Sequence, residues 1–272
     1  MPTCVSCGRE LPPGGYPDNI CPECRAAATV RAYEQARANR RAMYKATPVT
    51  SAIIGVNVLV FVAMTLSGVS PLMPHNADLV RWGANTGLQT LLLQPWRIWV
   101  SNYVHIGFAH IAANMWCLWN LGALAERIFD RWTYFLTYTC CGIAASLASL
   151  ALHPNRISAG ASGAIFGLAG ALIAALYLGK LPVHPRALRA TLKSLISFAV
   201  LNIFLGAVIP FIDNSAHVGG LASGLILGAV LAPHLTSSAD EKNSWRRLVF
   251  LVAGVVLFAI FVLVRRAAMH HS

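Results

Sequence analysis

The sequence predicts an all-α polytopic membrane protein: a six-helix transmembrane bundle, a seventh C-terminal transmembrane helix and a small polar N-terminal head. The first observation behind this prediction is composition. Of the 272 residues, 56% are apolar and 11% are charged, and the mean hydropathy is +0.58. Soluble domains carry about 25% charged residues, so disorder is excluded and a soluble enzyme is disfavoured. The second observation is a series of long apolar stretches, and the third is a polar start that holds four of the seven cysteines.

Seven apolar stretches are long enough to cross a bilayer, which takes about 20 helical residues. No apolar run precedes them, so we expect no cleavable signal peptide. The pattern divides the chain into a head (1–28), a basic linker helix (29–48), a six-helix core (49–233) and a linker with the seventh helix (234–272). The predicted spans are 49–67, 107–125, 132–152, 160–178, 194–212, 215–233 and 247–264.

The positive charges predict how these spans are oriented. The net charge is +11, and sixteen of the 21 Lys and Arg residues fall on one side if the N-terminus is cytosolic. Cytosolic loops of membrane proteins are enriched in Lys and Arg, so we expect the N-terminus inside and, after seven spans, the C-terminus outside. Arg265 and Arg266 oppose this placement of the seventh span. Because topology accounts for the basic charge, we expect no nucleic-acid partner.

Residues 68–106, between the first two predicted spans, form an unusually long connection. Loops of this length are uncommon in compact proteins unless they have a function. The segment carries Trp82, Trp96, Trp99 and Tyr103, and aromatic side chains favour the membrane–water interface. We therefore expect an interfacial element, which is either a passive anchor in the lipid or a lateral element that gates or supports a site.

The N-terminal head contains two CxxC pairs, Cys4–Cys7 and Cys21–Cys24. Two such pairs can place four thiolates around one tetrahedral zinc ion, and a segment this short needs a metal to fold because it cannot bury a core. The alternative is a pair of disulfides, which the reducing cytosol disfavours. We expect one structural zinc, because four thiolates leave no open coordination position for chemistry.

Polar residues inside the predicted spans are the candidates for function, because they are costly in a bilayer. His110 and Asn114 lie near the start of the second span, Ser162 near the start of the fourth and His217 near the start of the sixth. These three spans all run from outside to inside, so the polar side chains share one shallow layer below the outer surface. Taken singly, each is explained by packing or by a hydrogen bond within its own helix; their matched depth favours one site.

Glycine spacing indicates that two of these spans pack closely. Small residues recur at Gly163, Gly167 and Gly170 in the fourth span and at Gly220, Gly224 and Gly228 in the sixth, and such repeats let helix backbones approach. The approach would bring His217 within hydrogen-bond reach of Ser162, as a serine nucleophile requires of its base. A metal site is the alternative for His110 and His217, but the chain has no HExxH motif and no intramembrane carboxylate to complete one.

At these residues the chain resembles the rhomboid intramembrane serine proteases, over about residues 49–233. Four motifs carry the resemblance, in this order: Trp96-Arg97, His110-x-x-x-Asn114, Gly160-x-Ser162-Gly163 and Ala216-His217-x-Gly219-Gly220. The resemblance implies a rhomboid-like six-helix core. The head and the seventh helix are additions to that minimal pattern.

The resemblance also implies a role for each motif residue. Ser162 would be the nucleophile and His217 its general base, a dyad without an acid. The oxyanion would be bound by the side chains of His110 and Asn114 and by the backbone N–H of Ser162. Phe166 matches a position where an aromatic ring packs against the catalytic histidine. The supporting residues would be Gly160, Gly163, Gly220, Trp96 and Arg97.

The implied function is an intramembrane serine endopeptidase that cleaves in or near transmembrane segments and needs no cofactor for catalysis. Its partners would be transmembrane protein substrates and the lipid bilayer, with the head available to a cytosolic partner. We expect a multi-pass protein with a cytosolic N-terminus in the inner membrane of a bacterium. The alternative is a non-catalytic relative that binds or escorts membrane clients; such proteins lack the serine or the histidine. A transporter is a weaker alternative, because we find no inverted repeat.

Overall fold

The structure is a computed structural model that describes residues 1–45, 47–209 and 212–270. The chain divides into two compact units, Met1–Thr47 and Pro48–Ser272. In both units helices predominate, and the only strands among the described residues are two short segments of the second unit.

The first unit consists of a short looped segment followed by a helix. Thr3 and Glu10 form an isolated antiparallel bridge, and a short 3₁₀ turn, η1 (Pro17–Asn19), precedes helix α1 (Pro22–Lys45). Proline is favoured in the first turn of a helix because that turn does not use its amide hydrogen, so α1 begins directly after Cys21. Among the described residues of this unit, the core consists of Cys4, Leu11 and Cys21, flanked by Ile20 and Cys24. A core of this size is too small to stabilise a fold without a further constraint.

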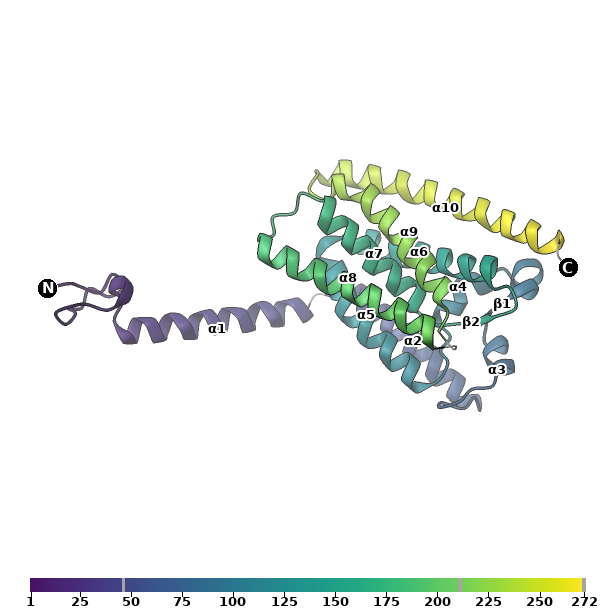
Figure 1. The fold of residues 1–272 in the computed structure, drawn as a ribbon, viewed down its shortest axis with the longest axis horizontal. Helices are drawn as coiled ribbons and strands as arrows, with labels where there is room; N and C mark the ends of the chain where they lie inside the picture. The colour runs from purple at the N-terminus through teal and green to yellow at the C-terminus, as the bar shows by residue number, and fades with distance from the viewer. Residues whose placement is uncertain (46, 210–211, 271–272) are drawn as a thin grey trace. The chain divides into compact units, whose positions relative to one another are not determined.

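The described residues of the second unit form seven long helices, one for each predicted span, and confirm the all-α polytopic fold. Figure 1 shows them as a bundle, with α10 along one edge. A short 3₁₀ turn, η4 (Ala232–His234), follows the sixth of them. The long helices are α2 (Pro48–Leu66), α5 (Phe108–Ile128), α6 (Arg131–Leu152), α7 (Ser162–Leu178), α8 (Pro185–Val208), α9 (Asn214–Leu231) and α10 (Ala239–His270).

Five of the seven helices are long and apolar enough to cross a membrane by length and composition alone; α5 and α7 are the two that are not. Helix α5 carries His110, Asn114 and Asn120, which lower its hydropathy. Helix α7 is only 17 residues long. Almost every residue of α7 is buried by its neighbours, so it is the central helix of the bundle and has little surface to present to lipid.

Helices α7 and α9 pack with their backbones in contact. A Cβ atom added to Gly220, Gly224 or Gly228 of α9 would overlap the carbonyl oxygen of Gly163, Gly167 or Ala171 of α7, respectively. Only glycine permits this approach along three successive turns. The contact between these two helices is the most extensive in the unit, and it brings the N-terminal ends of both helices to the same end of the bundle.

The connection between α2 and α5 is folded and packed. It contains α3 (Asn76–Arg81), β1 (Asn85–Thr86), the π-helical turn η2 (Gln89–Leu93), α4 (Arg97–Val100) and the 3₁₀ turn η3 (Ser101–Tyr103). Strand β1 pairs antiparallel with β2 (Ile157–Ser158), which immediately precedes α7. Because this pairing joins the long connection to the segment that leads into Ser162, the connection supports a site and is more than a lipid anchor.

Candidate active site

A cavity of about 310 Å³ opens among the N-terminal ends of α5, α7 and α9. It collects the candidate residues that the sequence singled out from three separate helices. Its walls also include Ser101 and Asn102 from η3 and Ile157 and Ser158 from β2. Its polar and aromatic lining residues include His110, Asn114, Ser162, Phe166, Asp213 and His217.

Ser162 is the first residue of α7 and His217 lies in the first turn of α9, so both face the cavity from helix starts. Among the described residues no hydrogen bond joins them, which differs from the expected direct contact. Nucleophile–base bonds are often long in the absence of substrate. The His217 ring stacks on that of Phe166, with centroids 4.2 Å apart and an angle of 13° between planes, so its orientation is fixed by packing.

His110 presents a hydrogen-bond donor to the cavity. Its Nδ1 atom accepts a hydrogen bond from the backbone N–H of Ile106 at 3.3 Å. In a neutral imidazole one ring nitrogen accepts and the other carries the proton, so Nε2 of His110 is the donor. The Nδ2 group of Asn114, one turn further along α5, is buried and has no hydrogen-bond partner among the described residues. Two hydrogen-bond donors on one face of α5 can therefore bind an acceptor in the cavity.

Gly160 allows the segment before α7 to pass directly over these donors. It has φ +124°, and a Cβ atom at this position would lie 2.6 Å from Cε1 and 2.9 Å from Nε2 of His110. Its backbone N–H donates to the carbonyl oxygen of Ser101 at 2.9 Å, which ties the segment to η3. Both the positive φ and the close approach require glycine.

His105 is a structural part of the site that the sequence did not single out for a role. It is fully buried, its Nδ1 atom lies 3.2 Å from the carbonyl oxygen of Tyr103, and its Nε2 atom accepts from the backbone N–H of Ala161 at 3.5 Å. Its ring lies 5.3 Å from that of His110. His105 thus fixes the residue before Ser162. No spacing pattern in the sequence distinguishes a histidine that acts only by holding a loop.

Trp96 and Arg97 are not among the residues that line the cavity. Arg97 is 97% buried, and its guanidinium donates to the carbonyl oxygens of Val80 and Ala84 and, at 2.7 Å, to the side chain of Gln94. The Trp96 ring covers the guanidinium at 4.9 Å. The pair therefore holds together the connection that supports the site. Gly163 and Gly220 act through the contact between α7 and α9.

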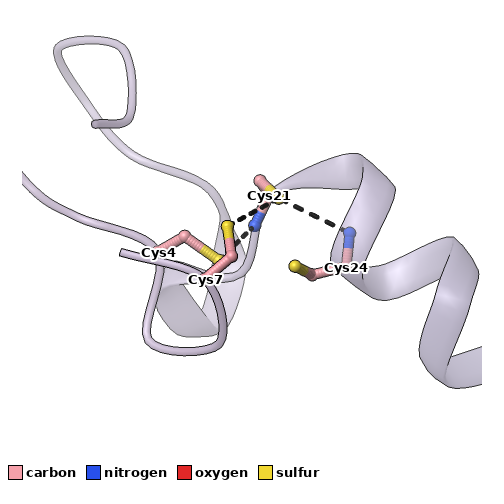
Figure 2. A group of neighbouring side chains, drawn as sticks. All are labelled: Cys4, Cys7, Cys21 and Cys24. Carbon is pink, nitrogen blue, oxygen red and sulfur yellow. Dashed lines mark hydrogen bonds between the residues drawn. The ribbon is translucent and has the colours of Figure 1, made fainter. Parts of the chain in front are cut away.

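The four head cysteines form a second cluster of chemical interest (Figure 2). Their Sγ atoms all lie within 4.8 Å of one another, and Cys7 and Cys21 are 3.8 Å apart. Sulfur atoms about 2.3 Å from a tetrahedral zinc ion lie about 3.8 Å from each other. Backbone N–H groups of Cys21 and Cys24 point at the sulfurs of Cys4 and Cys21, both at 3.4 Å. The arrangement fits a metal ion.

The crowded thiols of the cluster shift one another's pKa values in opposite directions. The backbone N–H of Cys21 lowers the pKa of Cys4 to about 6. The Ser6 side chain lowers the pKa of Cys24, but the neighbouring thiols of Cys21, Cys7 and Cys4, together with burial, outweigh it and raise that pKa to about 12. Without a cation, four thiolates this close repel one another, and a bound metal removes the repulsion. All four cysteines are free thiols in the described residues, as are Cys117, Cys140 and Cys141, so the structure contains neither of the disulfides considered as the alternative.

A protein-family model and several known proteins are similar to this chain. The Rhomboid domain family matches residues 92–234, just over half of the chain. Rhomboid protease GluP of Bacillus subtilis (strain 168) is 33% identical over 212 residues, which cover 78% of this chain and 40% of GluP. RHOMBOID-like protein 4 of Arabidopsis thaliana is 36% identical over 143 residues, 52% of this chain and 36% of that protein.

The similar proteins include one that is named as inactive. Inactive rhomboid protein 2 of Homo sapiens is 31% identical over 172 residues, which cover 62% of this chain and 20% of the human protein. The chain spans less than half the length of each of these relatives. The match to the Rhomboid domain family, residues 92–234, includes every cavity-lining helix that carries a candidate residue. The chain is a multi-pass integral membrane protein of the rhomboid family.

Proposed function

We propose that this protein is an intramembrane serine endopeptidase in which Ser162 is the nucleophile and His217 the general base. The observation that carries the proposal is the shared cavity: a serine hydroxyl, an oriented imidazole and two unpaired donors meet at the starts of three helices. A nucleophile, a base held in one orientation and a group of donors are the parts that acyl transfer requires.

In the proposed reaction, Ser162 Oγ attacks the carbonyl carbon of the scissile peptide bond while His217 takes the hydroxyl proton. The negative oxygen of the tetrahedral intermediate accepts hydrogen bonds from Asn114 Nδ2 and His110 Nε2. It also accepts one from the backbone N–H of Ser162, which as the first residue of α7 has no partner within the helix. His217 then protonates the leaving amine, and the acyl-enzyme is released by water that His217 deprotonates.

The orientation of His217 needs no carboxylate in direct contact with its ring. In a triad, an aspartate holds the histidine in the productive orientation, whereas here the stacked Phe166 ring fulfils that function. Donors that are preset around a developing oxyanion contribute a factor of about 10²–10³ in rate each. The rate enhancement therefore depends on how rigidly α5 and the segment around Gly160 are held.

The place of the cavity limits the class of substrate. The cavity lies at helix ends, where water can reach it, and a helical peptide bond would hide its carbonyl from Ser162. Substrates are therefore proposed to be transmembrane proteins whose spans unwind near one end. The Lys and Arg distribution favours a cytosolic N-terminus, with the cavity near the outer face of a bacterial inner membrane.

The second candidate function is a non-catalytic protein that binds transmembrane clients. It is favoured only by the similarity to the human relative named as inactive. Ser162 and His217 are both present in the cavity of this chain, which favours catalysis.

The two candidates are distinguished by a fluorophosphonate probe and a model transmembrane substrate in liposomes. The purified protein should be labelled and should cleave the substrate, whereas Ser162→Ala should do neither. Ser197→Ala, which removes an exposed hydroxyl from α8, is the matched control and should retain both. Unchanged cleavage by Ser162→Ala would contradict the protease proposal, and client binding without cleavage by the wild type would favour the second candidate.

For the head we propose one structural zinc ion held by Cys4, Cys7, Cys21 and Cys24. The ion would fix two loops that bury almost no core, and four thiolates leave no position open for a substrate. The head would then be a small rigid domain on the cytosolic side, available for binding by a cytosolic partner. It takes no part in the proposed bond cleavage.

A further inference from the structure

Asp213 is a half-buried acid that lines the cavity and that the proposed dyad does not use. It immediately precedes α9 and caps it: Oδ1 accepts the backbone N–H of Ala216 at 3.2 Å. Its Oδ2 accepts the Ser149 hydroxyl of α6 at 2.6 Å. Its carbonyl oxygen accepts the backbone N–H of His217 at 3.2 Å. The acid is thus fixed one helical turn before the proposed base.

The surroundings of Asp213 keep it ionised. Burial raises the pKa of this carboxyl, but hydrogen bonds from the Ser149 hydroxyl and the Ala216 amide, with the nearby Ser158 hydroxyl and Arg156 cation, outweigh burial and hold the pKa below its usual value. The group is therefore an anion at neutral pH. The carboxylate is hydrogen-bonded to α6 and to α9, and Ser158 belongs to β2, the strand that leads to Ser162.

The carboxylate and the His217 ring face the same cavity. Asp213 is the N-cap of α9, and its carbonyl oxygen accepts the backbone N–H of His217, so the two residues lie one turn apart at the start of the helix. Nδ1 of His217 is buried and has no hydrogen-bond partner among the described residues. When His217 takes the proton of Ser162, it becomes a buried cation, which is costly unless an anion is near. Across the cavity His110, the other imidazole, offers no negative charge.

We propose that Asp213 is a positioning residue whose fixed negative charge stabilises the His217 imidazolium during the reaction. The proposal rests on the protease function proposed above. The proton passes from Ser162 to His217 and on to the leaving amine, and Asp213 stays ionised throughout. The site is then a dyad with a remote acid that acts through space and through the helix start.

A purely structural role for Asp213 predicts a different result from its replacements. Asparagine caps a helix about as well as aspartate, through its one carbonyl oxygen. Its NH2 group would then face Ser149, and the Ser149 hydroxyl, which is both donor and acceptor, can accept that hydrogen bond in place of donating one. The start of α9 is also anchored independently, because His153 Nδ1 lies 2.7 Å from Ser215 Oγ and Asn214 Nδ2 donates to the carbonyl oxygen of Ile203 at 3.0 Å. Asp213→Asn therefore removes the charge and leaves the anchors in place.

The experiment measures kcat, KM and thermal stability of the full-length protein in liposomes with a model transmembrane substrate. Asp213→Asn should lower kcat by about tenfold to hundredfold, as loss of a nearby opposite charge predicts. KM and Tm should stay close to wild type, because the imidazolium forms only during the reaction. The matched control is Asp130→Asn, which changes the N-cap of α6 at the opposite end of that helix from Ser149. It should keep wild-type kcat.

Each outcome distinguishes this proposal from the protease proposal. If the wild type cleaves, Ser162→Ala does not, and Asp213→Asn cleaves at the wild-type rate, the role of Asp213 is wrong and the protease function stands. If Asp213→Asn loses stability as far as Asp213→Ala does, the residue is only a cap, and the proposal is again overturned. If the wild type itself neither cleaves nor takes the probe, the protease function fails first.

Discussion

The Phe166 and His217 rings are stacked nearly parallel, with centroids 4.2 Å apart. Phe166 lies one turn after Ser162 on α7, so the helix that presents the proposed nucleophile also presents the surface against which the proposed base packs. A second aromatic ring, Phe198 of α8, lies 5.5 Å from Phe166 on a third helix. The orientation of His217 thus depends on the packing of α7, α8 and α9 together.

Replacing Phe166 by leucine should lower kcat by about two- to tenfold, which corresponds to the 0.5–1.5 kcal/mol of an aromatic pair. The leucine keeps the apolar volume but removes the flat face against which His217 stacks, so the imidazole samples unproductive orientations. Turnover of a model substrate in liposomes measures the effect. Phe166→Tyr keeps the ring and is the control. A Leu variant as active as the Tyr variant would show that stacking does not orient the base.

Gly160→Ala should abolish most activity while the protein still inserts into the membrane. The added Cβ would lie 2.6 Å from the His110 ring, and φ +124° is unfavourable for alanine. We expect at least a tenfold loss of kcat, because His110 must move away from the oxyanion position. Gly254→Ala on α10 meets no atom within 4 Å and should be fully active. Wild-type turnover by Gly160→Ala would contradict the proposed position of His110.

Asn114→Ala should reduce kcat by about 10²–10³-fold with little change in KM, because its amide is proposed to bind the oxygen only once it is charged. Steady-state kinetics in liposomes separate the two constants. Asn120→Ala is the control on the same helix: this exposed side chain donates to the carbonyl oxygen of Trp116, one turn before it, and its loss should leave both constants unchanged. A raised KM at constant kcat would place Asn114 in substrate binding instead.

The sequence was sufficient to predict the elements that carry the site. Each polar span residue falls near the start of its helix, and Ser162 is the first residue of α7. The repeat of Gly220 and Gly224 predicts the backbone contact that the structure shows between α7 and α9. These features are local and periodic, so spacing alone reveals them.

The parts that escaped prediction depend on contacts between distant segments. His105 supports Ala161 across 56 positions, and β1 pairs with β2 although each strand has only two residues. Neither leaves a periodic pattern in the sequence. The sequence places Asp213 only in a turn, because its connection to Ser149 appears only when α6 and α9 are packed.

The four cysteines of the head predict the zinc content of the protein. Purified full-length protein should contain about one zinc ion per chain, as a site of four cysteine ligands requires. Cys24→Ser removes one ligand of the cluster and should lose most of the zinc, measured by elemental analysis. Cys140→Ser replaces a thiol of α6 outside the cluster and should retain it. Equal zinc content in both variants would contradict the proposed site.

Removal of the head should leave basal proteolysis intact. The head belongs to the compact unit Met1–Thr47, whereas every residue of the cavity belongs to Pro48–Ser272. No cysteine of the head lines the cavity, so the proposed zinc ion takes no part in the proposed bond cleavage. A truncated chain that begins at Thr47 should therefore cleave a model substrate within about twofold of the full-length rate, at equal amounts of inserted protein. A truncated protein that inserts and keeps its Tm but does not cleave would show that the head is coupled to the site, because loss of folding could not then explain the loss of activity.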